Sequence, residues 1–219
     1  MDIVSILETL SQKRPVFCSE ADFQFAFAWE IQSYYKGAAI RLEYPTRTNA
    51  SQHVDIMVRL GHEIYPIELK YKTASFAAGL DNGETISVKN HGAQDLGKYD
   101  FVGDICRLEC FRRTIGGFRE GYAVWLTNDR QYWHSPRYDT AGYYPFSVHE
   151  GAIKHGSMSW GSTMHSGSIK GRERPLNLSG SYLIRWSQYS RIASDNGLFM
   201  YSVISVPAEP PARSMSDIA

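Results

Sequence analysis

Two strand-like runs joined by only two residues constrain this chain more than any other feature. The runs HVDIMVRL (53–60) and EIYPIELKY (63–71) are separated by the dipeptide at 61–62, a link of the length that closes a tight β-hairpin. If Leu60 faces Glu63, the register of every other pair follows. One face of the hairpin then becomes wholly apolar, so the sequence predicts a hairpin with that face buried.

The polar face of this hairpin brings two carboxylates together. The same register places Asp55 opposite Glu68, and His53 opposite Lys70. Such opposed side chains have Cβ atoms about 4.5 to 5.5 Å apart, where like charges repel. Lys70 supplies one compensating charge, and a divalent cation would supply more, because Mg²⁺ is typically held by one or two carboxylates, waters and phosphate oxygens. The alternative to a metal site is an exposed cross-strand ion network.

The remaining pattern predicts an α/β fold with a mixed sheet and a helix on either face. The expected elements are a helix over 19–35 capped by Ser19 and Asp22, strands over 38–44, 121–127, 181–190 and 198–206, a loop or small hairpin over 73–90, and a helix over 93–113. Pro66 lacks an N–H on the side facing a fourth strand, so pairing there starts beyond Pro66 or passes a bulge. We expect one domain over residues 1–206 and a disordered tail over 207–219.

Composition excludes several classes of protein. The 219 residues are 43% hydrophobic and 13% aromatic, which is typical of a folded globular chain. Three cysteines without a C-x-x-C pair exclude a disulfide framework and a zinc ribbon. The apolar runs fall short of the roughly 18 residues of a membrane span and the N-terminus lacks a signal sequence, so we expect a cytoplasmic protein with no membrane partner. Zero net charge argues against a uniformly basic surface.

At the hairpin the sequence resembles the PD-(D/E)XK nuclease superfamily. The matching residues are Asp55 in HVDIMV, Glu68 and Lys70 in IELK, and Glu20 in SEADFQ, where many members have a first-helix acid. Of the eight lysines, only Lys70 follows an acid by two residues. The resemblance covers residues 19–128, with Val54 in place of the proline before the motif's aspartate. It implies a three-layer α/β/α, restriction-endonuclease-like core with extra C-terminal strands.

The resemblance also implies Mg²⁺-dependent hydrolysis of nucleic acid, with Mn²⁺ as a substitute ion. DNA is favoured over RNA as the substrate, and a DNA endonuclease is the expected enzyme. Asp55, Glu68 and the carbonyl of Leu69 would hold the metal, while Lys70 would orient or deprotonate the attacking water. Glu20 would recruit a second ion, with Glu30 as its rival. The alternative is a non-catalytic module that keeps the fold and binds nucleic acid or a protein. Monomer and homodimer both stay open.

Positive charge is concentrated late in the chain. Residues 150–191 carry six basic and two acidic side chains, and the Gly/Ser-rich part over 151–174 is either a surface loop or a clamp on a polyanion. The candidate nucleic-acid contacts are Lys154, Lys170, Arg172 and Arg174 in this segment, and Gln94 and Lys98 near the start of the second predicted helix. The aromatic residues between 132 and 146 form either core or a platform for stacked bases.

Overall fold

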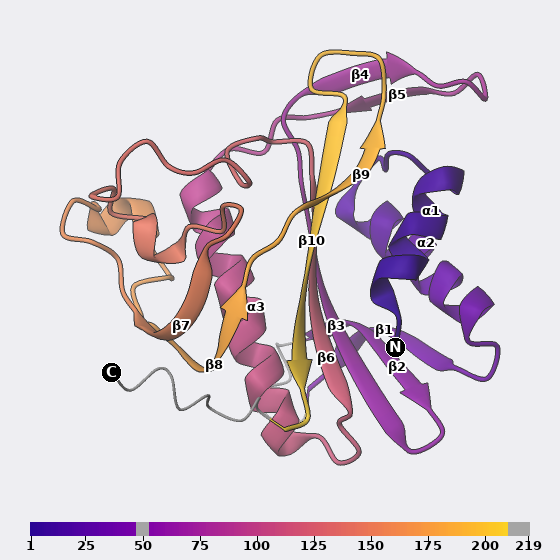
Figure 1. Cartoon of the computed structure of the whole chain (residues 1–219), viewed down its shortest axis with the longest axis horizontal. Helices are drawn as coiled ribbons and strands as arrows, with labels where there is room; N and C mark the ends of the chain where they lie inside the picture. Colours follow the sequence, from indigo (N-terminus) through magenta and orange to yellow (C-terminus); the bar gives the residue numbers. More distant parts are fainter. Residues whose placement is uncertain (47–52, 210–219) are drawn as a thin grey trace.

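The computed structural model describes residues 1–46 and 53–209, so residues 210–219 of the predicted tail lie outside the described residues. A six-stranded mixed sheet has the order β1-β2-β3-β6-β10-β9 (Figure 1). Its strands are β1 (Ala39–Pro45), β2 (His53–Leu60), β3 (Glu63–Lys72), β6 (Glu120–Thr127), β9 (Ser187–Arg191) and β10 (Leu198–Pro207). The helices are α1 (Ile3–Lys13), α2 (Glu20–Tyr34) and α3 (Gln94–Thr114). Two hairpins stand apart: β4 (Phe76–Gly79) with β5 (Thr85–Val88), and β7 (Ile153–Met158) with β8 (Leu176–Leu183).

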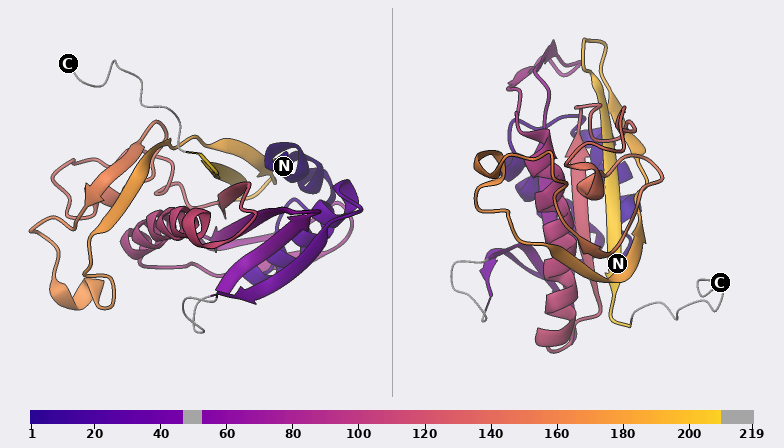
Figure 2. Two further views of the ribbon diagram at one scale, coloured as in Figure 1. Left: turned by 90° about the horizontal axis from the view of Figure 1, so that it is seen from below. Right: turned by 90° about the vertical axis from the view of Figure 1, so that its left-hand side faces the viewer.

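Two hydrophobic cores cover the two faces of the sheet. α1 and α2 pack against one face, around Ile56, Ile67 and Phe199. α3 and the β7–β8 hairpin pack against the other, around Trp125 and Phe146. Figure 2, right, looks onto α3 and this hairpin in front of the sheet. The predicted mixed sheet with a helix on either face is therefore confirmed.

The predicted hairpin register is confirmed from its turn to its middle. Leu60 pairs with Glu63, and Ile56 pairs with Ile67. Gly61 at the turn has a φ of +59°, in the left-handed region that glycine adopts without a steric penalty. A parallel bridge already joins Ile64 to Phe118, and regular pairing of β3 with β6 starts at Ile67 opposite Tyr122. The β6 side therefore has one extra residue across from Pro66, which is the bulge alternative for that proline.

The sequence-based elements are wrong at two places. α1 was not predicted at all, although its buried stripe Ile3, Ile6, Leu7 and Leu10 has helical spacing. The run over 181–190 is not one strand, because residues 184–186 leave the sheet and bond to the segment before β7. The Ile184 N–H donates to the carbonyl of Ala152, and the Trp186 indole donates to the carbonyl of Val148.

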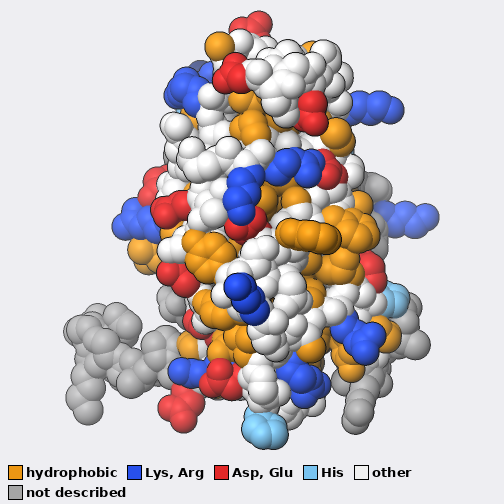
Figure 3. Space-filling view, turned by 90° about the vertical axis from the view of Figure 1, so that its right-hand side faces the viewer, with side chains coloured by type: hydrophobic (Ala, Val, Ile, Leu, Met, Phe, Trp, Pro, Cys, Tyr) orange, Lys and Arg blue, Asp and Glu red, His pale blue; other side chains and the backbone are white. Residues whose placement is uncertain are grey.

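The outer side of α1 and α2 exposes some large apolar side chains. Phe25 is 66% exposed and Trp29 is 78% exposed, one turn apart on α2. Figure 3 shows hydrophobic side chains on this side of the molecule, interspersed with charged ones. Separately, none of the helices in the described part of the chain has the length and hydropathy that a membrane span requires.

Candidate metal and catalytic site

The two strands of the hairpin separate where the motif residues begin. Pairing between β2 and β3 ends at Ile56 and Ile67. The Asp55 carboxylate instead accepts a hydrogen bond from the backbone N–H of Leu69 at 2.6 Å. The prediction that Asp55 lies directly across from Glu68 in a regular ladder is therefore wrong, although both side chains belong to one network.

An irregularity in β1 accompanies this separation. Glu43 has a left-handed φ of +48°, which costs a non-glycine residue about 1 kcal/mol. The side-chain amide of Gln24, on α2, donates to the Glu43 carboxylate and to the backbone carbonyl of Asp55, each at 2.7 Å. Gln24 thus holds the irregular backbone beside Asp55. The sequence analysis did not identify it, since nothing local to Gln24 indicates these distant partners.

The structure distinguishes Glu20 from Glu30 and His53, the two residues that were less firmly assigned to the site. The Glu20 carboxylate, at the start of α2, accepts from the backbone N–H of Tyr71 at 2.7 Å, directly beside the motif lysine. Glu30 is buried and is held by the ammonium of Lys13 at 2.7 Å. His53 is exposed and pairs with β1, not with β3 as predicted. Glu20 therefore joins the site, and Glu30 and His53 do not.

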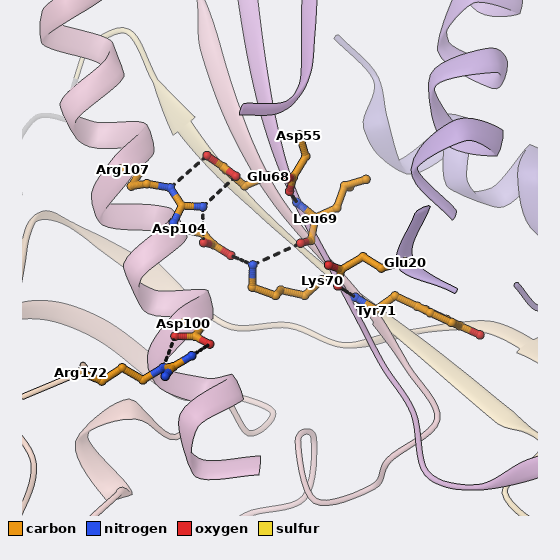
Figure 4. A network of polar contacts seen from close by, with 10 residues as sticks. All are labelled: Glu20, Asp55, Glu68, Leu69, Lys70, Tyr71, Asp100, Asp104, Arg107 and Arg172. Atoms are coloured by element: carbon orange, nitrogen blue, oxygen red, sulfur yellow. Dashed lines mark hydrogen bonds and ion pairs between the residues drawn. The ribbon is translucent and has the colours of Figure 1, made fainter. Parts of the chain in front are cut away.

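α3 closes the site with two charged residues that the sequence analysis missed (Figure 4). Glu68 is 1% exposed, and its two oxygens accept from the guanidinium of Arg107 at 3.2 and 2.8 Å. Arg107 also lies 2.6 Å from Asp104, and Asp104 lies 2.7 Å from the ammonium of Lys70. Asp104 is 1% exposed, so its carboxylate is buried between these two cations.

A signal for this pair was present in the sequence. Asp104 and Arg107 are three residues apart, so a helix places them on one side. Apolar residues on more than one side of this helix indicate that it is mostly buried, and charged residues are rarely buried without a partner. Opposite charges at this spacing on a buried helix therefore indicate an ion pair that faces the sheet.

Burial controls the protonation of the site. Loss of solvent raises the pKa of Asp55 to about 6, against the effect of the Leu69 hydrogen bond. Burial also raises the pKa of Glu68, although Arg107 opposes this. For Lys70, burial disfavours the ammonium, but the Asp104 carboxylate outweighs that cost and raises the pKa above its ordinary value. Lys70 is thus a cation in this state, suited to orient water and stabilise negative charge rather than to remove a proton.

The charges of the network do not balance. When all six side chains are ionised, four carboxylates face two cations and leave two negative charges: Glu20, Asp55, Glu68 and Asp104 against Lys70 and Arg107. No three His, Cys, Asp or Glu side chains in residues 1–46 and 53–209 form a ready-made cluster of metal ligands. A cation here would use two carboxylates, the carbonyl of Leu69 and waters, which is a set that Mg²⁺ accepts.

Two predicted nucleic-acid contacts are buried lysines. Lys98 is 4% exposed, and its ammonium lies 4.4 Å from the centre of the Tyr143 ring. Lys154 is 5% exposed and donates to the carbonyl of Pro145 at 2.9 Å. The expectation that both side chains face solvent and a polyanion is therefore wrong. Each is held among aromatic or carbonyl groups supplied by the segment over 129–149.

The other predicted contacts divide into paired and free side chains. Gln94 donates to Asp129 at 3.0 Å, and Arg172 holds Asp100 through two hydrogen bonds of 2.6 and 2.8 Å. Lys170 and Arg174 are exposed and have no ion-pair partner among the described residues. Tyr132 and Phe146 are buried, which supports the core interpretation of the aromatic cluster. The late segment thus offers two free cations.

Lys154 makes a prediction about stability and pH. Burial lowers its pKa from 10.5 to about 8. Between these values the unfolded chain keeps a proton that the folded protein has lost, so stability rises with pH. Lys154→Met removes this dependence, and the difference in unfolding free energy between variant and wild type should change by about 3 kcal/mol across that window. Urea denaturation at a series of pH values measures it, and parallel curves for the two proteins would contradict the prediction.

Comparisons with known proteins add no relatives. No protein-family model, no curated protein and no solved structure matches this chain.

Proposed function

We propose that this chain is a Mg²⁺-dependent phosphodiesterase that cuts nucleic acid and is built on a three-layer PD-(D/E)XK core. DNA is the favoured substrate. The observation that carries the proposal is the charge imbalance at the end of the β2–β3 hairpin. With every side chain ionised, Arg107 pairs with Glu68 and Lys70 pairs with Asp104, so the two remaining negative charges belong to Asp55 and Glu20. A divalent cation has the charge and the ligand preference that this arrangement lacks.

The order of elements supports the same proposal. α2 is followed by the antiparallel strands β1, β2 and β3, then, after the separate β4–β5 hairpin, by α3, and then by β6, which runs parallel to β3. Apart from that hairpin, this is the order of helix, three-stranded meander, helix and strand that the resemblance implies for residues 19–128. Glu68 and Lys70 lie on the part of β3 that pairs with β6, opposite Ala123 and Trp125, so the candidate catalytic groups are attached to the central sheet.

Each residue has a role that its surroundings suit. Asp55, Glu68 and the Leu69 carbonyl would hold the ion, which when bound lowers the pKa of a coordinated water and stabilises charge on the phosphate. Lys70, fixed by Asp104, orients the attacking water and neutralises charge on the phosphate. Glu20 adds a carboxylate at the exposed edge.

Arg107 has a double role in this proposal. It occupies both oxygens of Glu68, so this ion pair must open before Glu68 binds a metal. Once released, the guanidinium fork matches the geometry of a phosphate oxygen pair. We therefore place Arg107 among the groups that would meet the substrate.

Metal titration tests the proposal directly. Isothermal calorimetry with Mg²⁺ or Mn²⁺ should give a binding signal in the wild-type protein, and Glu68→Gln should remove it. Glu84→Gln, a change of an exposed carboxylate on the β4–β5 hairpin, is the matched control and should keep the signal. Cleavage of plasmid and single-stranded DNA is followed in parallel.

The same experiment distinguishes the enzyme from a non-catalytic binding module. A non-catalytic module would bind DNA without binding either metal and would cut neither substrate. That pattern, together with intact DNA binding in Glu68→Gln, would show that the protein is a binding module and not an enzyme.

A further inference from the structure

A cavity of about 550 Å³ lies between the last turns of α3 and the strands β1 and β2. Its floor is apolar and is formed by the buried side chains of Met57, Ile64 and Phe111. The volume falls within the roughly 300 to 1,000 Å³ of pockets that hold small ligands. Such a floor suits a flat, uncharged group rather than a sugar or a phosphate.

Two arginines stand at the rim of this cavity. Arg41 pairs with Met57 and Arg59 pairs with Ala39, so the two arginines are diagonal neighbours on one face of the sheet. Both are exposed, and no carboxylate in residues 1–46 and 53–209 lies within 4 Å of either. Two unneutralised guanidinium groups so close together favour an anion, and their forked donors match phosphate.

The cavity shares one side of the sheet with the candidate site. Phe111 follows Arg107 by four residues on α3, which is about 6 Å along the helix axis. Ile64 precedes Glu68 by four residues on the same face of β3, about 13 Å along the strand. Successive nucleotides of a B-form strand are about 3.4 Å apart, so a strand lying over Glu68 passes the cavity within a few nucleotides.

We propose that the cavity binds one unpaired base of the strand that the candidate site cuts, with its neighbouring phosphates on Arg41 and Arg59. Tyr44, which also lines the cavity, supplies an aromatic ring for stacking on the base. This choice of ligand rests on the proposed function. A base enters such a pocket only outside a duplex, so the protein prefers single-stranded or frayed DNA to paired DNA.

Binding without metal tests this inference separately from cleavage. A fluorescent single-stranded oligonucleotide and its duplex are titrated in EDTA, where the single strand should bind more tightly. The double variant Arg41→Gln/Arg59→Gln should weaken single-strand binding about tenfold or more and flatten its salt dependence by up to about 1.4 in log–log slope. Ala39→Phe, which adds a ring at the cavity wall and keeps both arginines, should weaken single-strand binding and leave duplex binding unchanged.

The control is the double variant Lys36→Gln/Arg191→Gln, which removes the same charge from exposed positions outside the cavity and should keep single-strand binding within about twofold. Thermal unfolding confirms that each variant is folded. Unchanged single-strand binding in either cavity variant overturns the inference. A fluorescent fatty acid is titrated as a second probe. If the cavity variants lose binding of the fatty acid alone, the inference is also overturned, because the occupant is then an amphipathic carboxylate.

Failure of the inference and failure of the proposed function give different results. If Mg²⁺ does not bind but the cavity variants lose single-strand binding, the cavity inference stands without the enzyme. If Mg²⁺ binds and the cavity variants bind DNA normally, the metal site stands and the cavity inference falls.

Discussion

Replacing Arg107 by Met should lower the free energy of unfolding by about 3 to 5 kcal/mol at about pH 8. The variant leaves Glu68 and Asp104 buried and close together, with only Lys70 to compensate both carboxylates. A buried pair that loses one partner is costly because the remaining charge has neither water nor a counter-ion. Chemical denaturation monitored by tryptophan fluorescence measures the loss.

The pH dependence of this loss follows from the same cause. Burial already raises the pKa of Glu68, and removing Arg107 raises it further. In the variant the folded state therefore holds a proton that the unfolded state has released, and stability falls as pH rises. The wild-type pKa of Glu68 is already about 8, so the two folded proteins differ in bound protons only above that value, and the deficit should be smaller at about pH 7 than at about pH 9. Arg113→Met, at an exposed position of α3, should change stability by less than about 0.5 kcal/mol. An equal deficit at both pH values would contradict the role given to Arg107.

Cleavage should fall about a thousandfold or more when Lys70 is replaced by Met or Asp55 by Asn. Lys70→Met removes the cation that Asp104 holds beside the phosphate, and Asp55→Asn removes a charge from the metal ligands. The two losses should have different signatures. Asp55→Asn should also weaken Mg²⁺ binding in calorimetry, whereas Lys70→Met should retain it.

Initial rates on a labelled DNA substrate at saturating Mg²⁺ measure this effect. Lys36→Met, which changes an exposed lysine outside the network, is the control and should keep the wild-type rate. Full activity in protein that carries both Asp55→Ala and Lys70→Ala would refute the proposed function.

Local features of the sequence predicted the part of the fold that local interactions determine. The β2–β3 register follows from the two-residue turn, and the start of α2 follows from Ser19, whose side chain accepts from the Asp22 N–H at 3.1 Å. Both involve residues a few positions apart. The positions of β9 and β10 in the sheet depend on long connections, and no local pattern distinguishes their order.

The candidate site shows the same division. The motif residues on β3 were identified from spacing alone, whereas Gln24 was not, because its partners lie 19 and 31 residues away. The buried lysines misled the prediction for a related reason. A lysine is normally exposed, and only the aromatic ring and carbonyl from distant segments make burial of Lys98 and Lys154 tolerable.

The span of the ion network along the chain has a consequence for how the protein folds. Asp55 accepts from the Leu69 N–H within the hairpin, but the guanidinium partner of Glu68 comes 39 residues later, on α3. Closing that longer loop costs more chain entropy, so the hairpin can form while its carboxylates still face water. Contacts made after the rate-limiting barrier slow escape from the native state more than they speed its formation. The ion pair between Arg107 and Glu68 therefore acts chiefly on the lifetime of the folded molecule.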